Sequence, residues 1–385
     1  MVTFAVPTPP TSGGRKRALR LLEAMERAGA TPHVLAMEGT PEGTEALRTR
    51  GWAVDVVPHG PPRAAMRARQ LARLEPEPHN AALVARLREL APETLLVQVE
   101  EIWQAQLATS VPAGVPSIAS LHNVDSRLQR DLSAASPWQS REALRLRYRA
   151  LRMAAVERRA IRAARATLAV SEEDATTFER RGAQSVLRVP NGVDEGLFEL
   201  PIDGGEPGRV LFFGAFFWPP NRLGIERFLD EGWPAVVARR PDARLRIVGP
   251  GPVEALRARA AGVPGVDVAG LVPDIADELA RASVVVVPVW LGGGTRIKVL
   301  EALAAARPVV GTSVGVERVG FRDGVHGFVR DAPEDLADGI VRLLGDPAAA
   351  RRMGAAGREH GEAFRWTRTT APAEELYRTM LAEAG

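Results

Sequence analysis

The sequence contains no cysteine among its 385 residues. This absence excludes disulfide bonds, a thiol nucleophile and a zinc-thiolate site, and it gives no sign of an oxidising compartment. No Asp-X-Asp triplet occurs either, so the usual carboxylate pair for a divalent metal is missing. Apolar runs fall far short of the ~20 residues that a membrane-spanning helix needs, and the first residues lack a basic signal-peptide region. We therefore expect a cytoplasmic protein that works without a metal ion or other cofactor.

Aromatic residues and lysines are also scarce. Aromatics make up 5% of the chain, which argues against a nucleic-acid partner because single strands bind by stacking on aromatic rings. Lysine occurs only as Lys16 and Lys298, and every other basic residue is arginine. Arginines far outnumber glutamates in the helical run 141–165. This helix is expected either to present a solvated face or to contact the anionic surface of a membrane.

Short apolar runs alternate with helical stretches along the chain, which is typical of parallel sheets with crossover helices. We expect two doubly wound α/β domains, 1–198 and 209–364, that face each other across a cleft. The glycine- and proline-rich segment 202–208 is the expected linker, and the last helix, within 367–385, is expected to return to the first domain. The expected strands are 2–6, 32–37, 53–57, 94–99, 116–121, 167–170, 186–189, 209–213, 244–248, 266–269, 283–287, 308–310 and 327–329.

Three successive glycines, Gly292, Gly293 and Gly294, join the apolar run 283–288 to a helix that should begin near Thr295. Glycines at this junction leave backbone N–H groups and the positive end of the helix dipole open to a ligand. The segment therefore predicts an anion site.

Two cationic residues follow the glycines. Arg296 and Lys298 add positive charge, and a compact ammonium group suits a phosphate at a glycine loop. The alternative is that Lys298 pairs with Glu301, three residues further on, along an exposed helix face.

Gly13 and Gly14 follow the first strand, with Lys16 close behind. They do not form the Gly-X-Gly-X-X-Gly pattern of dinucleotide-binding proteins, which counts against NAD. A Gly-Gly pair is usually only a turn, but this pair is expected to face the same cleft as the glycine loop in the second half.

Six motifs are spread over the chain: Val-Pro-Asn-Gly-Val-Asp (189–194), Phe-Phe-Gly (212–214), Phe-Trp-Pro-Pro-Asn (217–221), Arg-Leu-Arg-Ile-Val-Gly-Pro-Gly (244–251), Gly-Leu-Val-Pro-Asp (270–274) and Lys-Val-Leu-Glu-Ala-Leu-Ala-Ala-Ala-Arg-Pro-Val-Val (298–310). Together they resemble the family 4 glycosyltransferases, which have the GT-B fold of two Rossmann-like domains, and the resemblance covers nearly the whole chain. The motif 217–221 and the loop at 292–298 resemble a bacterial branch of that family.

This resemblance implies a retaining transferase that moves a sugar from a UDP-, GDP- or dTDP-sugar to a hydroxyl on a glycan, a lipid-linked sugar or a small molecule. In this family a phosphate oxygen is thought to take the acceptor proton, so no enzyme nucleophile is required. Arg296, Lys298 and His122 are the implied catalytic residues, and Glu301 matches the family's ribose ligand. The implied donor-binding residues are Gly13, Gly14, Lys16, Gly214, Asn221, Gly249, Val272, Pro273, Gly292, Gly293, Gly294, Thr295 and Glu301.

The chain departs from the family pattern at two places. The family's first loop glutamate, which holds sugar hydroxyls, is replaced by Gly293. The family's arginine and lysine after the first strand of the donor domain are replaced by Ala215 and Asn221, and Arg296 and Lys298 are expected to supply the lost charge. Two other interpretations therefore stay open: a related nucleotide-sugar 2-epimerase, and a nucleotide-sugar-binding protein without catalysis.

Polar residues also follow two strands of the first domain. His122 and Asn123 come after the run 116–121, where the family has a histidine near the sugar and acceptor, although His122 could instead cap the strand end or the next helix. Glu100 and Glu101 follow the preceding strand, and they either face the acceptor or lie in a solvated loop.

Overall fold

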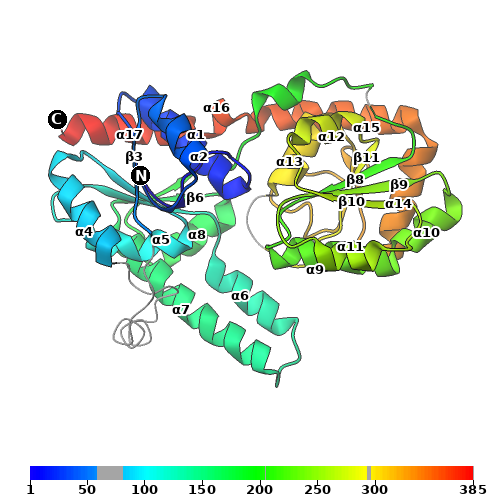
Figure 1. Cartoon of the computed structure of the whole chain (residues 1–385), viewed down its shortest axis with the longest axis horizontal. Helices are drawn as coiled ribbons and strands as arrows, with labels where there is room; N and C mark the ends of the chain where they lie inside the picture. The colour runs from blue at the N-terminus through cyan, green and yellow to red at the C-terminus, as the bar shows by residue number, and fades with distance from the viewer. Residues whose placement is uncertain (59–80, 204, 293–295, 385) are drawn as a thin grey trace. The chain divides into compact units, whose positions relative to one another are not determined.

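The structure, a computed structural model, describes residues 1–58, 81–203, 205–292 and 296–384 (Figure 1). The chain divides into two compact units, each with its own sheet. Unit 1 comprises Met1–Asn191 and Thr369–Gly385, and unit 2 comprises Gly192–Arg368. Both sheets are parallel and covered by helices, so the predicted fold class of two doubly wound α/β domains is confirmed.

In the described part of unit 1, seven strands form one sheet in the order β3-β2-β1-β4-β5-β6-β7, and every neighbouring pair is parallel. The inner strands are buried on both faces, as a parallel sheet between helices requires. The strands are β1 (Val2–Ala5), β2 (His33–Glu38), β3 (Ala53–Val56), β4 (Val97–Glu100), β5 (Ser117–Leu121), β6 (Ala166–Ala169) and β7 (Val186–Arg188).

Two hydrophobic cores lie in unit 1. One packs α4, α5, α7 and α8 against the sheet, and the other packs α1, α2 and the C-terminal helix α17 against it. Helix α17 therefore belongs to this unit, where Tyr377 and Met380 are buried. The helices are α1 (Gly13–Arg27), α2 (Pro41–Arg48), α4 (Ala81–Leu90), α5 (Glu101–Ala105), α6 (Asp125–Ala134), α7 (Arg141–Ala163), α8 (Glu172–Arg180) and α17 (Ala371–Ala384), with 3-10 turns at Ala91–Glu93 and Gln106–Ser110.

Unit 2 contains, among its described residues, a six-stranded parallel sheet in the order β10-β9-β8-β11-β12-β13. Its strands match the predicted ranges to within a residue at either end. The strands are β8 (Arg209–Phe213), β9 (Arg244–Val248), β10 (Val266–Gly270), β11 (Val284–Val287), β12 (Val309–Gly311) and β13 (Gly327–Val329).

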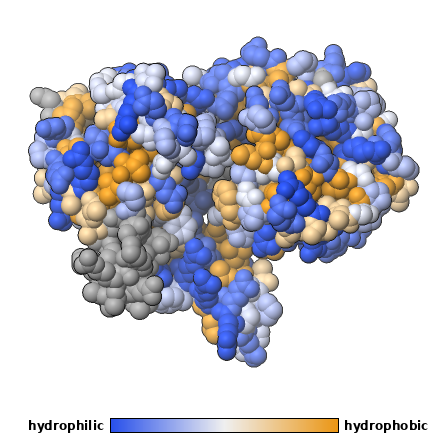
Figure 2. Space-filling model, viewed as in Figure 1, coloured by the Kyte–Doolittle hydropathy of each residue, from blue (hydrophilic) through white to orange (hydrophobic). Residues whose placement is uncertain are grey.

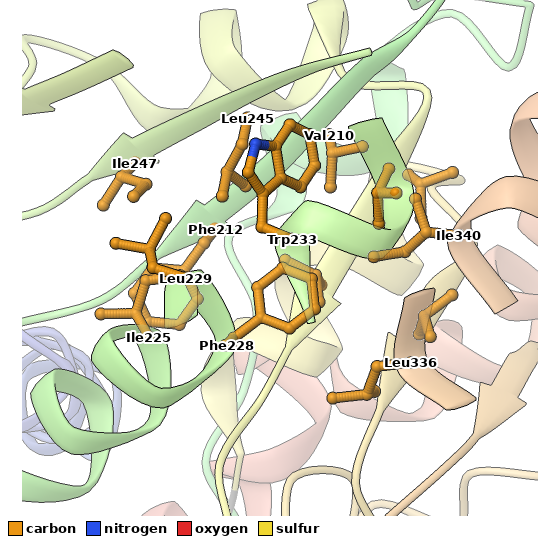
Figure 3. Close-up of a cluster of buried hydrophobic side chains, with 14 of the residues drawn as sticks. Val210, Phe212, Ile225, Phe228, Leu229, Trp233, Leu245, Ile247, Leu336 and Ile340 are labelled. Atoms are coloured by element: carbon orange, nitrogen blue, oxygen red, sulfur yellow. The ribbon is translucent and has the colours of Figure 1, made fainter. Parts of the chain in front are cut away.

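Helices cover both faces of this second sheet. On one face Phe228 and Trp233, from α9 and α10, pack with Ile340 of α14 against the strands (Figure 3). The indole N–H of Trp233 donates to the carbonyl of Pro264 at 2.9 Å, so its one polar atom is satisfied inside the core. The helices are α9 (Pro219–Glu231), α10 (Trp233–Arg239), α11 (Glu254–Ala260), α12 (Ile275–Arg281), α13 (Ile297–Ala304), α14 (Pro333–Gly345), α15 (Pro347–Gly361) and α16 (Trp366–Thr369), with 3-10 turns at Glu195–Glu199 and Glu362–Phe364.

The expected linker at 202–208 does not lie between the two units, because this part of the chain belongs to unit 2. The chain passes between the units at Asn191–Gly192 and at Arg368–Thr369. Glu206 fastens the predicted linker to unit 2, since its carboxylate pairs with Arg209 and Arg281 and its N–H donates to the Arg281 carbonyl. Low apolar content therefore marked a surface loop rather than a boundary.

The strand order reverses at β1/β4 in unit 1 and at β8/β11 in unit 2. Open α/β sheets bind ligands outside the carboxyl ends of their strands at such a switch point. The segments after β1, β4 and β5 carry the predicted site residues of unit 1, and the segments after β8, β9, β10 and β11 carry those of unit 2.

Candidate functional site

In unit 2 the structure joins two predicted residues that are far apart in the sequence. Lys298, in the first turn of α13, donates from Nζ to Oδ1 of Asn221, in the first turn of α9, at 2.6 Å. The ammonium also lies 4.7 Å from the ring centroid of Phe212 on β8, a cation–π distance. Lys298 is half-buried and Glu301 is buried, so the two do not lie on an exposed helix face, although the charge of Glu301 does act on Lys298.

Gly214 completes the seat of this ammonium group. Its φ is +155°, and a Cβ built on it would lie 2.7 Å from Nζ of Lys298 and 2.8 Å from Nδ2 of Asn221. Gly249, after β9, approaches even more closely, because a Cβ there would lie 1.9 Å from the Gly214 carbonyl oxygen. Both glycines are therefore needed for close backbone approach at the ends of β8 and β9.

These surroundings lower the pKa of Lys298. Burial, with a smaller contribution from the charge of Arg296, lowers the pKa of Lys298 to about 7, against the opposing effect of Glu301. An ammonium group with this pKa gains a full charge when an anion binds beside it. Perturbed cations of this kind cluster at functional sites.

Arg296 precedes α13 and is 7% exposed. Its guanidinium donates from Nε to the Val314 carbonyl and from Nη2 to Glu317 Oε1, each at 3.0 Å. A Cβ on Gly292, whose φ is +135°, would lie 3.0 Å from its Nη1. Arg296 therefore ties the end of the glycine loop to the segment after β12.

The other predicted donor residues of unit 2 are placed as follows. Glu301 is buried in α13, Val272 is half-buried and Pro273 is exposed in the turn between β10 and α12. Gly293, Gly294 and Thr295 lie outside the described residues. Helix α13 begins at Ile297, slightly later than predicted.

In unit 1 the structure brings Gly14, Glu101 and His122 together. Gly13 and Gly14 form the first turn of α1, and a Cβ on Gly14 would lie 2.5 Å from Oε1 of Glu101 and 3.4 Å from Nδ1 of His122. His122 Nδ1 is itself 3.8 Å from that carboxylate oxygen. Because Gly14 has no side chain, the first turn of α1 can pack closely against the residues that follow β4 and β5.

His122 is held by a buried polar chain. Its Nε2 lies 2.7 Å from Oε2 of Glu100, Gln98 Nε2 donates to Oε1 of Glu100 at 2.5 Å, and Tyr377 donates to Gln98 Oε1 at 2.7 Å. His122 lies directly after the last residue of β5, as the strand-end interpretation has it, but it does not cap the next helix, because the N-cap of α6 is Val124. Glu100 is the last residue of β4 and 1% exposed, so its placement in a solvated loop is wrong.

The two neighbouring carboxylates are shifted in opposite directions. Burial alone would raise the pKa of Glu100, but the hydrogen bond from His122 and the charges of His122 and Arg17 outweigh it and lower the pKa. Burial raises the pKa of Glu101, against the charge of His122. Glu101 also has a φ of +65°, a conformation that costs roughly 1–3 kcal/mol in a residue other than glycine and often occurs at functional sites.

Sequence reasoning missed Arg17 and Tyr377 as parts of this site. Arg17 is 1% exposed and donates from Nη1 to the Val189 carbonyl at 2.7 Å and to Asn191 Oδ1 at 3.2 Å. Its position four residues before Leu21, on the buried face of α1, was the available signal. Lys16 and Asn123 are half-buried near the same strand ends.

The structure thus has two Rossmann-like units, one with the Gly14–Glu101–His122 cluster and one in which Asn221 holds Lys298. Family models match both halves: one described as Glycosyltransferase Family 4 over residues 11–197, and one described as Glycosyl transferases group 1 over residues 207–346. The chain belongs to the family 4 glycosyltransferases of the GT-B fold.

Named relatives match part of the chain. The phosphatidyl-myo-inositol mannosyltransferase of Mycobacterium leprae is 34% identical over 212 residues, which cover 53% of this chain and 56% of that protein. The D-inositol 3-phosphate glycosyltransferase of Streptomyces scabiei is 36% identical over 157 residues, which cover 36% of this chain and 34% of that one. The matches thus span about half the length of these relatives or less.

Solved structures match nearly the whole chain. Sucrose-phosphate synthase from Thermosynechococcus elongatus superposes with a TM-score of 0.72 at 19% identity, covering 99% of this chain and 98% of that one. Anabaena HepE in complex with UDP-glucose superposes with a TM-score of 0.68 at 18% identity, covering 99% and 98%. At these identities the likeness shows the GT-B fold.

The described residues contain neither a membrane-spanning helix nor a metal-binding cluster. None of the helices placed there is long and apolar enough to cross a membrane. No group of three or more histidine, aspartate or glutamate side chains in those ranges could hold a metal ion.

Proposed function

We propose that this protein is a retaining glycosyltransferase that moves a sugar from a nucleoside-diphosphate sugar to an acceptor hydroxyl. The observation that carries the proposal is the ammonium of Lys298, held by Asn221 beside Gly214 at the carboxyl end of β8. Such a transfer requires stabilisation of the charge that develops on the leaving diphosphate. A half-buried cation in the first turn of a helix supplies it.

Each cluster has a distinct role in this proposal. Lys298 binds the leaving diphosphate, while Arg296, held by Glu317, lies beside Gly292. Glu301 binds the ribose. In unit 1, His122 and Gly14 act on the sugar and diphosphate, and Glu100 orients His122. Glu101 and Asn123 meet the acceptor.

The donor is proposed to be a UDP-, GDP- or dTDP-sugar. A donor of this kind fits the solved structures of HepE with UDP-glucose, and a lipid-linked or inositol-type acceptor fits the names of the relatives. Gly293 stands where the family places a glutamate on the sugar, so we expect the sugar hydroxyls to be held by other residues. We further propose a bacterial enzyme of the cytoplasm, peripheral to the membrane, with no nucleic-acid partner.

The test is to incubate the protein with UDP-, GDP- and dTDP-sugars and to identify the products. Slow release of nucleoside diphosphate, faster with an added acceptor, is the expected result. A sugar isomer without transfer would favour the 2-epimerase interpretation. Nucleotide binding without any turnover would favour a binding protein and would contradict the proposed transfer.

We predict that EDTA leaves donor turnover unchanged. The sequence has no Asp-X-Asp triplet, and Lys298 supplies positive charge where a metal ion would otherwise neutralise the diphosphate. Turnover is measured in metal-free buffer with EDTA and again with added magnesium or manganese. Strict dependence on either ion would contradict the metal-independent mechanism.

A further inference from the structure

Helix α7 carries apolar side chains on the face that points away from the core of unit 1. Leu144, Tyr148 and Leu151 are 57%, 39% and 65% exposed. They follow each other at i, i+4 and i+7, so they lie on one side of the helix. The opposite side is buried through Ala150, Met153 and other residues. Helix α7 is therefore apolar on both faces, and the fold of unit 1 covers only one.

Arginines border this apolar stripe along both edges. At 100° per residue, Arg145 and Arg152 lie on one edge, and Arg147 and Arg158 lie on the other. In the described ranges, Arg145, Arg147 and Arg158 form no ion pair with a carboxylate. Surface arginines on α17 differ, since Arg378 pairs with Glu374 and Glu375. The charge beside the stripe is thus left for a partner.

The α6–α7 hairpin extends beyond the sheet of unit 1 (Figure 1), and in Figure 2 apolar colour lies on it beside strongly hydrophilic colour. Trp138, in the turn between the two helices, is 68% exposed. Exposed tryptophan, leucine and tyrosine together with unpaired arginines are typical of helices that lie in a membrane interface. The aromatic rings sit at the headgroup level, and the arginines meet lipid phosphates.

We propose that α7 docks unit 1 on an anionic membrane surface, with Leu144, Tyr148 and Leu151 inserted and the flanking arginines on the lipid headgroups. Arginines along both edges give the stripe a positive border, and this charge complements an anionic lipid surface. The proposal stands independently of the glycosyltransferase activity, because vesicle binding requires no donor.

The experiment is co-sedimentation of the full chain with vesicles of phosphatidylcholine, alone or mixed with phosphatidylglycerol. The protein should bind the mixed vesicles, bind poorly to phosphatidylcholine alone, and dissociate at high salt. The double variant Leu144→Ser/Leu151→Ser should weaken binding roughly tenfold or more. The double variant Arg145→Gln/Arg147→Gln should weaken it by about tenfold or more as well.

Matched controls exist on the same unit. Leu95→Ser changes a leucine that is 49% exposed, and Arg27→Gln/Arg378→Gln removes two arginines that pair with carboxylates. Both controls should bind vesicles as the unchanged protein does. Circular dichroism checks that every variant is folded, and donor turnover in vesicle-free solution should be the same in all of them.

Two results would overturn the proposal. One is equal sedimentation of the unchanged protein with neutral and mixed vesicles, or equal sedimentation of the α7 variants and the controls. The other is a dimer, seen by sedimentation velocity, that Leu144→Ser/Leu151→Ser abolishes while vesicle binding persists; the stripe would then be an interface between two copies.

Discussion

Lys298→Met is expected to lower donor turnover by roughly 10- to 100-fold and to weaken nucleoside-diphosphate binding in proportion. A charge-assisted hydrogen bond to a diphosphate contributes about 1.5–3 kcal/mol, and methionine removes that bond while keeping an unbranched stem over Phe212. Turnover is followed by release of nucleoside diphosphate, and affinity is measured by calorimetry.

The matched control for this variant is Arg239→Met. Arg239 is a cation of the same unit, 41% exposed and paired with Asp338 on the surface. Its loss should leave turnover and affinity close to those of the unchanged protein, because exposed ion pairs contribute little. Equal activity of Lys298→Met and the control would place the diphosphate elsewhere in the chain.

Diphosphate binding should take up a proton above neutral pH. Burial and Arg296 lower the pKa of Lys298 to about 7, so at pH 8 the free protein holds it mostly as the neutral amine. A bound diphosphate raises that pKa again, so affinity should fall by up to about tenfold per pH unit above pH 7. The same shift affects the stability of the fold. The pKa of Lys298 is about 7 in the folded protein and 10.5 in the unfolded chain, so between these pH values only the unfolded chain holds the proton. The free energy of unfolding therefore rises with pH through this window, and the destabilising effect of the buried ammonium group is lost.

Calorimetry in two buffers of different ionisation enthalpy measures this uptake directly. About one proton per site is expected at pH 8 for the unchanged protein and much less for Lys298→Met. An uptake that is the same in both proteins would contradict the assignment. The scarcity of lysine offers a second readout, because Lys16 is the only other lysine in the chain. Because its pKa is about 7, Lys298 is partly a neutral amine at neutral pH and should react with an acylating reagent. Bound diphosphate should protect Lys298 from this modification.

The strands of unit 2 could be predicted closely because they are short runs rich in Val, Leu, Ile and Phe, bounded by glycine, proline or charged residues. Arg209–Phe213 and Arg244–Val248 agree with the prediction at both ends. Their short length, their β-branched residues and the turn residues beside them favour buried strands over helices. The glycine positions were also predictable, since a glycine after a strand indicates close backbone approach.

The partners of the site residues could not be predicted from local pattern. Lys298 meets Asn221 across 77 positions of sequence, and Glu100 meets His122 across 22. These contacts depend on which strands become neighbours, and β4 pairs with β1 on one side and β5 on the other. Glu100 was misplaced for the same reason, because a carboxylate reads as exposed unless its buried partner is known.

Asn221 is the position at which the structure explains the departure of this chain from the family pattern. The family places a lysine at this position, and here Lys298 reaches it from a different helix, with Gly214 leaving room for the ammonium group. The sequence predicted that Lys298 replaces the lost charge. The contact with Asn221 gives a physical reason for that hypothesis, which the Lys298 variant tests.

His122→Ala is expected to lower turnover by about 10²-fold while leaving nucleoside-diphosphate affinity within about twofold, as a group that acts mainly in the transition state should. The ring is fixed through Nε2 by the ionised Glu100, whose pKa is lowered, and Nδ1 lies near Gly14. Nδ1 is therefore the atom available to the sugar or diphosphate. The Lys298 seat lies in unit 2, so the loss of this ring should not disturb it.

The matched control is His33→Ala. His33 also pairs with a carboxylate in unit 1, its Nε2 lying 2.9 Å from Oδ2 of Asp55, but at the start of β2 and away from the strand ends that carry the site. It should leave turnover unchanged. Glu100→Gln keeps the shape of the buried chain but removes the charge that holds the ring, so it should lower turnover without affecting diphosphate affinity. Added imidazole should restore part of the activity of His122→Ala and none of that of Glu100→Gln. Loss of nucleotide binding in His122→Ala, or turnover equal to that of the His33 variant, would show that this cluster is not part of the active site.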